Sequence, residues 1–240
     1  MSAPPPWHLV GDGFIWLFHF APDFVERNGG LTDWQRASLK NRLGAVMLVD
    51  YRETNIGPYR ELLFIPGQFQ PGGWRSFSIS KIYVSTEASV RYGIENWGIP
   101  KELAVFVRDR RNGSAQVFSV MRDGWTIFSS QLAPFGPRFP ISSSLVPLTV
   151  AQERRGDLLI TRSTARGWAR LCRVRDLRVD ARHFPDVTRV RPMLVLAVSD
   201  FRMTFPEPQV IKGYFAQSRE ALADSFQRLT ASGVGSADSG

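Results

Sequence analysis

The feature that most constrains the fold of this chain is a series of short strand-like segments separated by turn residues. Residues 103–108, 115–121 and 125–131 are three such segments, and Asn112-Gly113 and Asp123-Gly124 lie between them. Asparagine or aspartate before glycine favours the two-residue turn of a β-hairpin, because both turn positions need a positive φ. The sequence therefore predicts adjacent antiparallel strands here.

Apolar and β-branched segments of similar length continue along the rest of the chain. The turn at residues 54–58 predicts a hairpin between 45–51 and 59–65. Residues 14–20 are apolar with little alternation, so we expect both faces of that strand to be covered. Further strands are expected at residues 79–84, 145–150, 157–170, 171–180, 194–198 and 201–204. This pattern predicts an α+β fold that is mostly antiparallel β.

The segments between the predicted strands contain few helix signals. Thr32 is a candidate cap for a helix reaching Leu43, and Thr86 for two turns ending near Tyr92. Residues 1–13 are expected to be a loose lead-in and 133–140 to be irregular. Residues 66–77, rich in glycine, proline and glutamine, are expected to form a long loop that serves as a lid or an oligomer contact.

Length and composition favour one packed domain over residues 1–231. The chain has 240 residues, of which 43% are hydrophobic and 17 are phenylalanine, enough for a large core. Residues 232–240 are rich in serine and glycine and are expected to be disordered. No signal peptide and no membrane-length apolar stretch is visible.

The single cysteine and the positive charge bear on location and partners. Cys172 excludes an internal disulfide and fits a reducing, cytoplasmic compartment; it is interpreted as a buried thiol in a strand rather than a catalytic one. The net charge of +8 comes from scattered arginines without a nucleic-acid-binding motif. We therefore expect no nucleic-acid partner and no membrane, and a basic surface that attracts anionic substrates.

One lysine is placed where a charged amine is costly. Trp97-Gly98-Ile99-Pro100 precedes Lys101, and a strand beginning at Leu103 follows it, so Lys101 lies among apolar residues. Burying an ammonium is expensive unless the group loses its proton. A lysine whose stem packs on Trp97 and whose amine reaches water is the alternative.

Composition favours amine chemistry at this lysine. Of 30 basic residues only four are lysines, namely Lys40, Lys81, Lys101 and Lys212. Arginine supplies charge elsewhere in the chain, and only lysine can lose a proton and attack a carbonyl carbon. Lys212 lies beside Gly213 with no apolar turn to bury it, so Lys101 is the candidate nucleophile.

The segment from Glu95 to Ala104, with the strand Ile82-Tyr83-Val84 before it, resembles the acetoacetate decarboxylase family. Gly57-Pro58-Tyr59-Arg60-Glu61 resembles the strand that carries the family's essential glutamate. The likeness extends in order and spacing from about Phe14 to Phe215, and its central third is specific. It implies an acetoacetate decarboxylase-like closed β-barrel or cone with a few short helices.

The resemblance also implies catalytic residues. Lys101 would form a Schiff base with an oxo acid, and Glu61 would be an acid/base or orienting carboxylate; in the family, desolvation or a neighbouring cation activates the lysine. Strand alternation places Glu61 on the face of Tyr59, Leu63 and Ile65, an unusual place for a carboxylate without a partner. A surface glutamate paired with an arginine is the alternative.

The sequence departs from the family pattern at two positions. Glu102 replaces the second lysine that directly follows the nucleophile, and alternation would point it away from the Lys101 amine. Burial would then have to do most of the activation of Lys101. His19 aligns loosely with an arginine that helps bind the substrate carboxylate. These departures weaken the decarboxylase assignment while the Schiff-base assignment survives.

Further site residues follow from the resemblance or from position. Tyr214 matches a tyrosine that some members use as an acid/base, and Trp97 is a candidate substrate-binding residue beside the nucleophile. A packed histidine and a packed tyrosine are the alternatives for His19 and Tyr214. The three histidines lack metal-ligand spacing, so no metal is expected. No cofactor is expected, since a lysine imine is its own electron sink.

The predicted function is therefore that of a cofactor-free Schiff-base lyase acting on a small oxo acid. Acetoacetate-type decarboxylation through Lys101 is the first candidate reaction, and an aldolase-dehydratase reaction on an oxo acid such as pyruvate is the second. A barrel of the same fold that binds a small ligand without catalysis is the alternative from another class. The resemblance implies a homo-oligomer.

Overall fold

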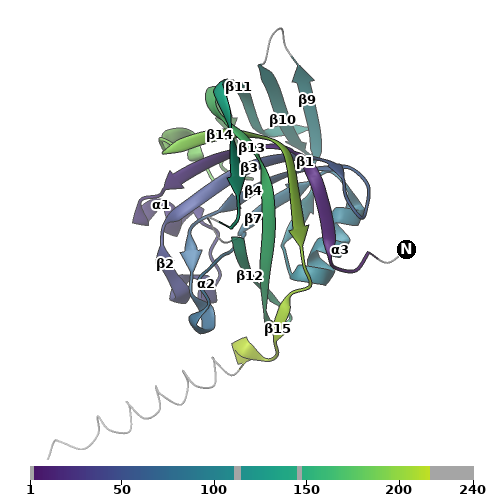
Figure 1. The fold of residues 1–240 in the computed structure, drawn as a ribbon. Helices are drawn as coiled ribbons and strands as arrows, with labels where there is room; N and C mark the ends of the chain where they lie inside the picture. The colour runs from purple at the N-terminus through teal and green to yellow at the C-terminus, as the bar shows by residue number, and fades with distance from the viewer. Residues whose placement is uncertain (1–2, 111–114, 145–147, 217–240) are drawn as a thin grey trace, which may run out of the picture.

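The computed structural model describes residues 3–110, 115–144 and 148–216 of the chain, and its strands form a 15-stranded sheet. The sheet is strongly curled into a half-barrel or cone, and the few helices are short (Figure 1). The strands are β1 (Trp7–His19), β2 (Leu39–Asn41), β3 (Leu43–Glu53), β4 (Tyr59–Ile65), β5 (Gln68–Phe69), β6 (Ser76–Phe77), β7 (Lys81–Val84), β8 (Lys101–Leu103), β9 (Val105–Arg110), β10 (Gln116–Arg122), β11 (Trp125–Ser142), β12 (Leu148–Arg154), β13 (Asp157–Val179), β14 (Leu194–Phe205) and β15 (Gln209–Ile211). The helices are α1 (Pro22–Asn28), α2 (Asp33–Ser38) and α3 (Glu87–Trp97), with 3-10 turns η1 (Pro71–Gly73) and η2 (Val187–Arg189).

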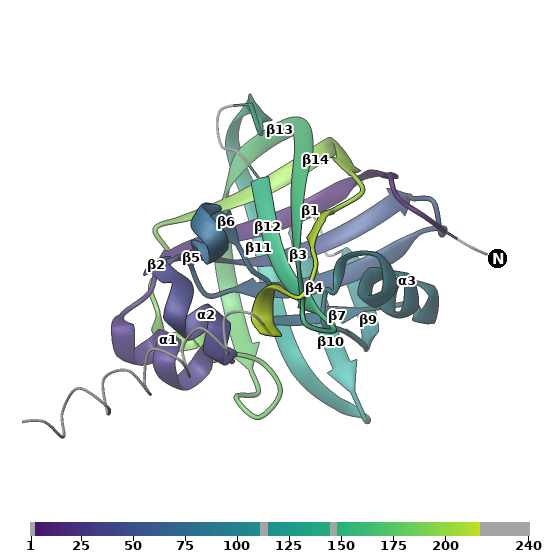
Figure 2. The same ribbon diagram turned by 90° about the horizontal axis from the view of Figure 1, so that it is seen from below.

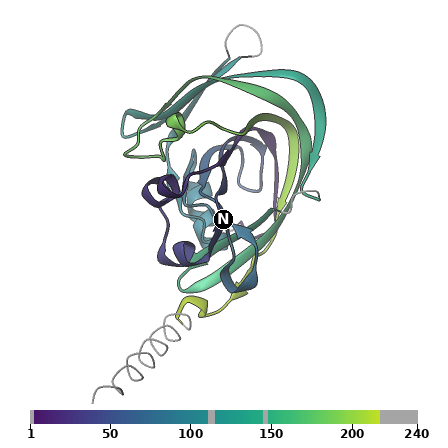
Figure 3. The ribbon, with the colours of Figure 1, turned by 90° about the vertical axis from the view of Figure 1, so that its left-hand side faces the viewer.

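Strand pairing is mostly antiparallel, as predicted. The main path runs β2-β5-β6-β12-β13-β14-β1-β3-β4-β7-β8, and β9, β10 and β11 extend the sheet from β13. Only the β6–β12 and β7–β8 pairs are parallel within the described part of the chain. Figure 3 shows the long strands curving around the molecule, while α1 and α2 lie on the opposite side from α3 (Figure 2).

The predicted turn chemistry is confirmed where the structure describes it. Asp123 and Gly124 have φ values of 50° and 81° and join β10 to β11. The 54–58 turn joins β3 to β4, with Gly57 at φ 84°. Asn112-Gly113 lies outside the described residues.

Side-chain alternation gives the sheet two apolar faces. On β1, Phe14, Trp16 and Phe18 face one side, while Ile15 and Leu17 face the other, which confirms that both faces of this strand are covered. We call the two clusters the first core and the second core. The first core includes Phe14, Trp16, Phe18, Leu48, Leu62, Phe64, Phe118, Phe128 and Cys172. The second core includes Leu9, Val49, Tyr51, Tyr59, Leu63, Ile82, Trp97 and Leu196.

Several segments differ from the sequence-based expectation because long-range pairing orders them. The lead-in becomes strand from Trp7, where β1 pairs with β14. The helix expected from Thr32 to Leu43 ends at Ser38, because Leu39 pairs with Phe69 in β5. The expected loop at 66–77 is instead β5, η1 and β6, held between β2 and β12. Residues 133–140 belong to β11, which pairs with β13 across a register shift between Phe135 and Phe139.

Three further expectations concern the thiol, the membrane and the domain. Cys172 is buried in β13, and burial raises its pKa to about 11, as expected for an inert structural thiol. No helix among the described residues is long and apolar enough to cross a membrane. The tail at 232–240 lies outside the described residues, and the single domain over 1–231 stays a prediction.

Candidate active site

Helix α3 and the turn after it determine where Lys101 lies. Thr86 caps the helix by accepting a hydrogen bond from the Ser89 N–H, as predicted, and Gly98 ends it in the left-handed conformation at φ 66°. Pro100 follows, and the chain enters β8, which pairs in parallel with β7 so that Lys101 lies opposite Ile82. The helix runs to Trp97, longer than the two turns expected, and packs over this short strand.

Lys101 and Glu61, separated by 40 positions in sequence, form a buried ion pair. The Lys101 Nζ lies 3.0 Å from Glu61 Oε2 and 3.0 Å from the Ser89 hydroxyl oxygen. The two charged side chains are only 5% and 6% exposed. Alternation along β4 points Glu61 to the second core, as predicted, and Lys101 is the partner that its carboxylate needs there.

Two tyrosines complete the surroundings of the pair. The Tyr51 hydroxyl donates to Glu61 Oε1 at 3.3 Å, and the Lys101 Nζ lies 5.0 Å from the centre of the Tyr59 ring. Burial raises the pKa of Tyr59 to about 12. Burial, and then the Glu61 charge, raises the pKa of Tyr51 well above its usual value. Both phenols therefore keep their protons at neutral pH, and Tyr51 donates its proton in the hydrogen bond to Glu61.

The charge state of Lys101 differs from the expectation that burial would free the amine. Burial by itself lowers the pKa of Lys101, but the Glu61 carboxylate, with help from Tyr59, outweighs burial and raises it above its ordinary value. The resting Lys101 amine is therefore an ammonium, hydrogen-bonded to Glu61. Burial alone does not activate this lysine, so the amine must pass its proton to a neighbour before it can react.

Glu102 points to the other face of β8, as alternation predicted. It accepts from Lys81 at 2.5 Å and from Arg122. Burial raises the pKa of Glu102, but hydrogen bonds from Lys81 and Arg122 outweigh it and lower that pKa below its usual value. The Lys101 amine therefore has no second lysine beside it in sequence, and its neighbours are Glu61, Ser89 and the Tyr59 ring.

Sequence reasoning missed two residues of α3 that position the amine. Ser89 hydrogen-bonds the amine, and Gly93 lies against its stem: a Cβ at Gly93 would be 2.6 Å from Lys101 Cδ and 2.8 Å from Cε. Ser89, Gly93 and Trp97 are the buried residues of the helix and are spaced four apart. That spacing places them on one helix face and was the available signal.

Of the other predicted site residues, Trp97 lies on this helix face but its polar group is already used. Its Nε1 donates to the Pro206 carbonyl at 2.8 Å, and its ring packs edge-on between Trp7 and Phe205. These contacts join α3 to the neighbouring strands β1 and β14, where Trp7 pairs with Phe205. Trp97 therefore supports the helix that carries Ser89 and Gly93.

The structure does not bring His19 or Tyr214 to Lys101. His19 is exposed at the end of β1. Across the sheet, Gly13 of β1 pairs with Val49 of β3, which pairs with Glu61 of β4. His19 lies six residues beyond Gly13, or about 20 Å along the strand. Tyr214 packs edge-on against Phe215 in a separate apolar cluster. In residues 3–110, 115–144 and 148–216, no group of three histidine, cysteine or carboxylate side chains could hold a metal ion.

Comparison with known proteins finds one family model and several solved structures. The family model described as acetoacetate decarboxylase matches residues 37–150, a range that contains Glu61 and Lys101. A search of curated proteins finds no match.

The solved structures share the fold at low sequence identity. An acetoacetate decarboxylase from Legionella pneumophila is 14% identical, with a TM-score of 0.66, over 88% of this chain and 90% of that chain. The enduracididine biosynthesis enzyme MppR complexed with pyruvate is 14% identical, with a TM-score of 0.63, over 89% and 93%. An acetoacetate decarboxylase-like enzyme from Sphingomonas wittichii RW1 is 11% identical, with a TM-score of 0.64, over 88% and 94%.

Proposed function

Because this chain belongs to the acetoacetate decarboxylase family, we propose that it is a cofactor-free lyase that forms an imine between Lys101 and a small oxo acid. The observation that carries the proposal is the buried Lys101–Glu61 pair, with Nζ and Oε2 3.0 Å apart. A buried ion pair contributes little net stability, because desolvation offsets the attraction. A nucleophilic amine with an acid/base group one hydrogen bond away is a functional arrangement.

The first step is proton transfer within the pair. The Lys101 ammonium gives a proton to Glu61 Oε2 along their hydrogen bond, leaving a neutral amine and a neutral carboxylic acid. Burial penalises both charges, so the neutral pair is much closer in free energy here than it would be in water. The Ser89 hydroxyl can accept a hydrogen bond from one of the remaining amine N–H groups and so hold the lone pair in a fixed direction.

Imine formation then uses Glu61 in both directions. The amine attacks the ketone carbon, and the Glu61 acid protonates the resulting alkoxide. The carboxylate takes a proton from nitrogen and returns it to the hydroxyl group, which leaves as water. The product is a protonated imine, whose positive charge lies beside the regenerated Glu61 carboxylate.

Decarboxylation of an acetoacetate-type acid follows from this cation. The electrons of the bond to the carboxylate move into the imine as carbon dioxide leaves, and an enamine remains. The second core around Tyr59, Ile82 and Trp97 disfavours a charged carboxylate and favours its loss as a neutral gas. Protonation of the enamine and addition of water release the ketone and restore Lys101.

An aldolase-dehydratase reaction on a pyruvate-type acid is the second candidate. Its support is the departure from the decarboxylase pattern at Glu102, which stands in place of a second lysine and faces Lys81 and Arg122. Tyr51, which donates to Glu61, adds a hydrogen-bond donor at the same pair. MppR, of similar fold, has been solved with pyruvate bound.

Borohydride trapping tests the proposal. The protein is incubated separately with acetoacetate and pyruvate, reduced with borohydride, and analysed as intact protein and as peptides by mass spectrometry. An added mass on the peptide that contains Lys101 is expected, and carbon dioxide release with acetoacetate selects decarboxylation. Folded protein without an adduct from either acid would contradict the proposal and favour a barrel that binds a ligand without catalysis.

A further inference from the structure

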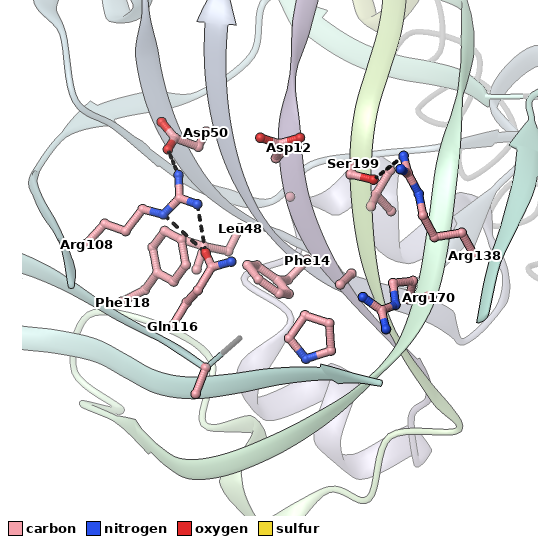
Figure 4. Close-up of a pocket in the computed structure, with 15 residues that line it drawn as sticks. Asp12, Phe14, Leu48, Asp50, Arg108, Gln116, Phe118, Arg138, Arg170 and Ser199 are labelled. Atoms are coloured by element: carbon pink, nitrogen blue, oxygen red, sulfur yellow. Dashed lines mark hydrogen bonds and ion pairs between the residues drawn. The ribbon is translucent and has the colours of Figure 1, made fainter. Parts of the chain in front are cut away.

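A pocket of about 450 Å³ opens on the face of the sheet opposite to Lys101. Phe14 and Leu48 of the first core form part of its lining (Figure 4). Asp50 lines the same pocket. The next residue, Tyr51, lies on the opposite face of the sheet, where its hydroxyl donates to Glu61. The pocket and the Lys101 site are therefore separated by the strands β3 and β4.

The two carboxylates in the pocket lining are already paired. Asp50 accepts from Arg60 at 3.1 Å and from Arg108 at 2.5 Å. Asp12 pairs with Arg52. Each carboxylate of the lining is therefore neutralised by at least one arginine, so the pocket does not attract a cation. A second pair of arginines on the opposite wall leaves the lining with a net positive charge.

Those two arginines differ from each other. Arg138 donates to the Ser199 hydroxyl at 3.1 Å and to Asp200 at 3.0 Å. Arg170 donates through Nε to the Gly136 carbonyl at 2.9 Å and has no carboxylate partner among the residues that the structure describes. Figure 4 shows the Arg170 guanidinium on the pocket side of β13 near Phe14. Its terminal nitrogens are therefore available to a ligand.

The floor of the pocket is apolar and well packed. Phe14, Leu48 and Phe118 line it and are 5%, 1% and 3% exposed, so they form a fixed surface. A guanidinium binds a carboxylate through two parallel hydrogen bonds, and an apolar group gains free energy by covering such a floor. A pocket of this volume lies within the range of small-molecule sites.

We propose that this pocket binds an organic monocarboxylate with an apolar body, whose carboxylate pairs with Arg170 and whose apolar body covers Phe14 and Phe118. The site is distinct from Lys101, because it lies across the sheet, and it does not depend on the proposed lyase activity.

A titration of the full chain with 4-phenylbutyrate tests the proposal by calorimetry. Arg170→Met should weaken binding at least about tenfold, since a charge-assisted pair is lost. Arg166→Met is the matched control, because Arg166 is exposed on the same strand and outside the pocket lining. It should change the affinity less than about twofold. The neutral amide, 4-phenylbutyramide, should bind about tenfold more weakly than the acid.

Three outcomes of the titration would overturn the proposal. They are no binding of the acid to the wild-type chain at about 10 mM, equal affinity in Arg170→Met, and equal weakening in Arg166→Met. A chemical measurement on the wild-type protein avoids any folding defect of a variant. Phenylglyoxal modifies accessible arginines, and 4-phenylbutyrate should protect Arg170 but not Arg166; an unprotected Arg170 would also overturn the proposal.

Discussion

Two lysine–glutamate pairs lie on opposite faces of the β7–β8 region and differ mainly in burial. Lys101 and Glu61 are 5% and 6% exposed, while Lys81 and Glu102 are 29% and 35% exposed. Lys101 and Glu102 are consecutive in sequence, so one strand supplies a member to each pair. The Lys81–Glu102 pair, called the outer pair, also includes Arg122. Among the residues that the structure describes, the Lys101–Glu61 pair, called the inner pair, has only uncharged further hydrogen-bond partners.

The difference shows what burial does to the same chemistry. Solvent and a second cation keep the outer glutamate ionised, and such a pair contributes about 0–1 kcal/mol. The inner pair is shielded from water, so a proton that leaves Lys101 has the Glu61 carboxylate as a basic acceptor one hydrogen bond away. The outer pair is therefore an internal control for every experiment on the inner one.

Arginine substitution gives the largest expected contrast. Lys101→Arg keeps the charge but cannot form an imine, so turnover of the accepted oxo acid should fall at least about 10⁴-fold and borohydride labelling should disappear. Lys81→Arg can still pair with Glu102, and its turnover should stay within about twofold of wild type. An unchanged rate in Lys101→Arg would remove this residue from the mechanism.

Amide substitution separates the base from the nucleophile. In Glu61→Gln the carboxylate that raises the Lys101 pKa is gone while burial remains, so that pKa should fall and the amine should be free. Turnover should drop about 10²–10⁴-fold, whereas labelling after long incubation should persist. Glu102→Gln should leave both unchanged, and loss of labelling in Glu61→Gln would contradict a purely acid/base role.

Unfolding in urea compares the two pairs as structural elements. Lys101→Met leaves Glu61 buried without its cation and should cost about 3–5 kcal/mol. Lys81→Met should cost about 0–1 kcal/mol. Similar costs for the two variants would contradict the burial argument.

The same variants give a pH dependence with a definite sign. The folded-state pKa of Lys101 is raised above its ordinary value of 10.5, so the ion pair contributes fully below pH 10.5. Its contribution is lost as the pH rises through the folded-state pKa. The stability difference between wild type and Lys101→Met should therefore stay constant from neutral pH to 10.5 and shrink above it.

The smallest expected effect comes from the helix that positions the amine. Gly93→Ala places a methyl group against the Lys101 stem and should displace Nζ from Glu61, lowering turnover about 10–100-fold. Arg91→Ala, on the exposed side of α3, should lower it less than about twofold. A Gly93→Ala enzyme of wild-type activity, with an unchanged melting temperature, would show that the stem can move without consequence.

Much of the fold was predictable because its signals are local. Asp123-Gly124 predicted a hairpin turn with two positive φ values, and both residues have them in the structure. The apolar run from Phe14 correctly indicated a strand covered on both faces. The 66–77 segment was mispredicted as a loop, because its strands are two residues long and are ordered by partners far away in sequence. Short segments of this kind carry too little local pattern to identify.

Sequence by itself determined which residue types could carry the chemistry: a rare lysine after an apolar turn, and a glutamate on the apolar face of a strand. Alternation also fixed that Glu102 would face away from Lys101. Only the tertiary structure decided that Glu61 is the partner of Lys101, that Ser89 and Gly93 hold the amine, and that the resting amine is protonated. The physical reason is that charge state depends on the balance between burial and neighbouring charges, and both are created when β4, β8 and α3 come together.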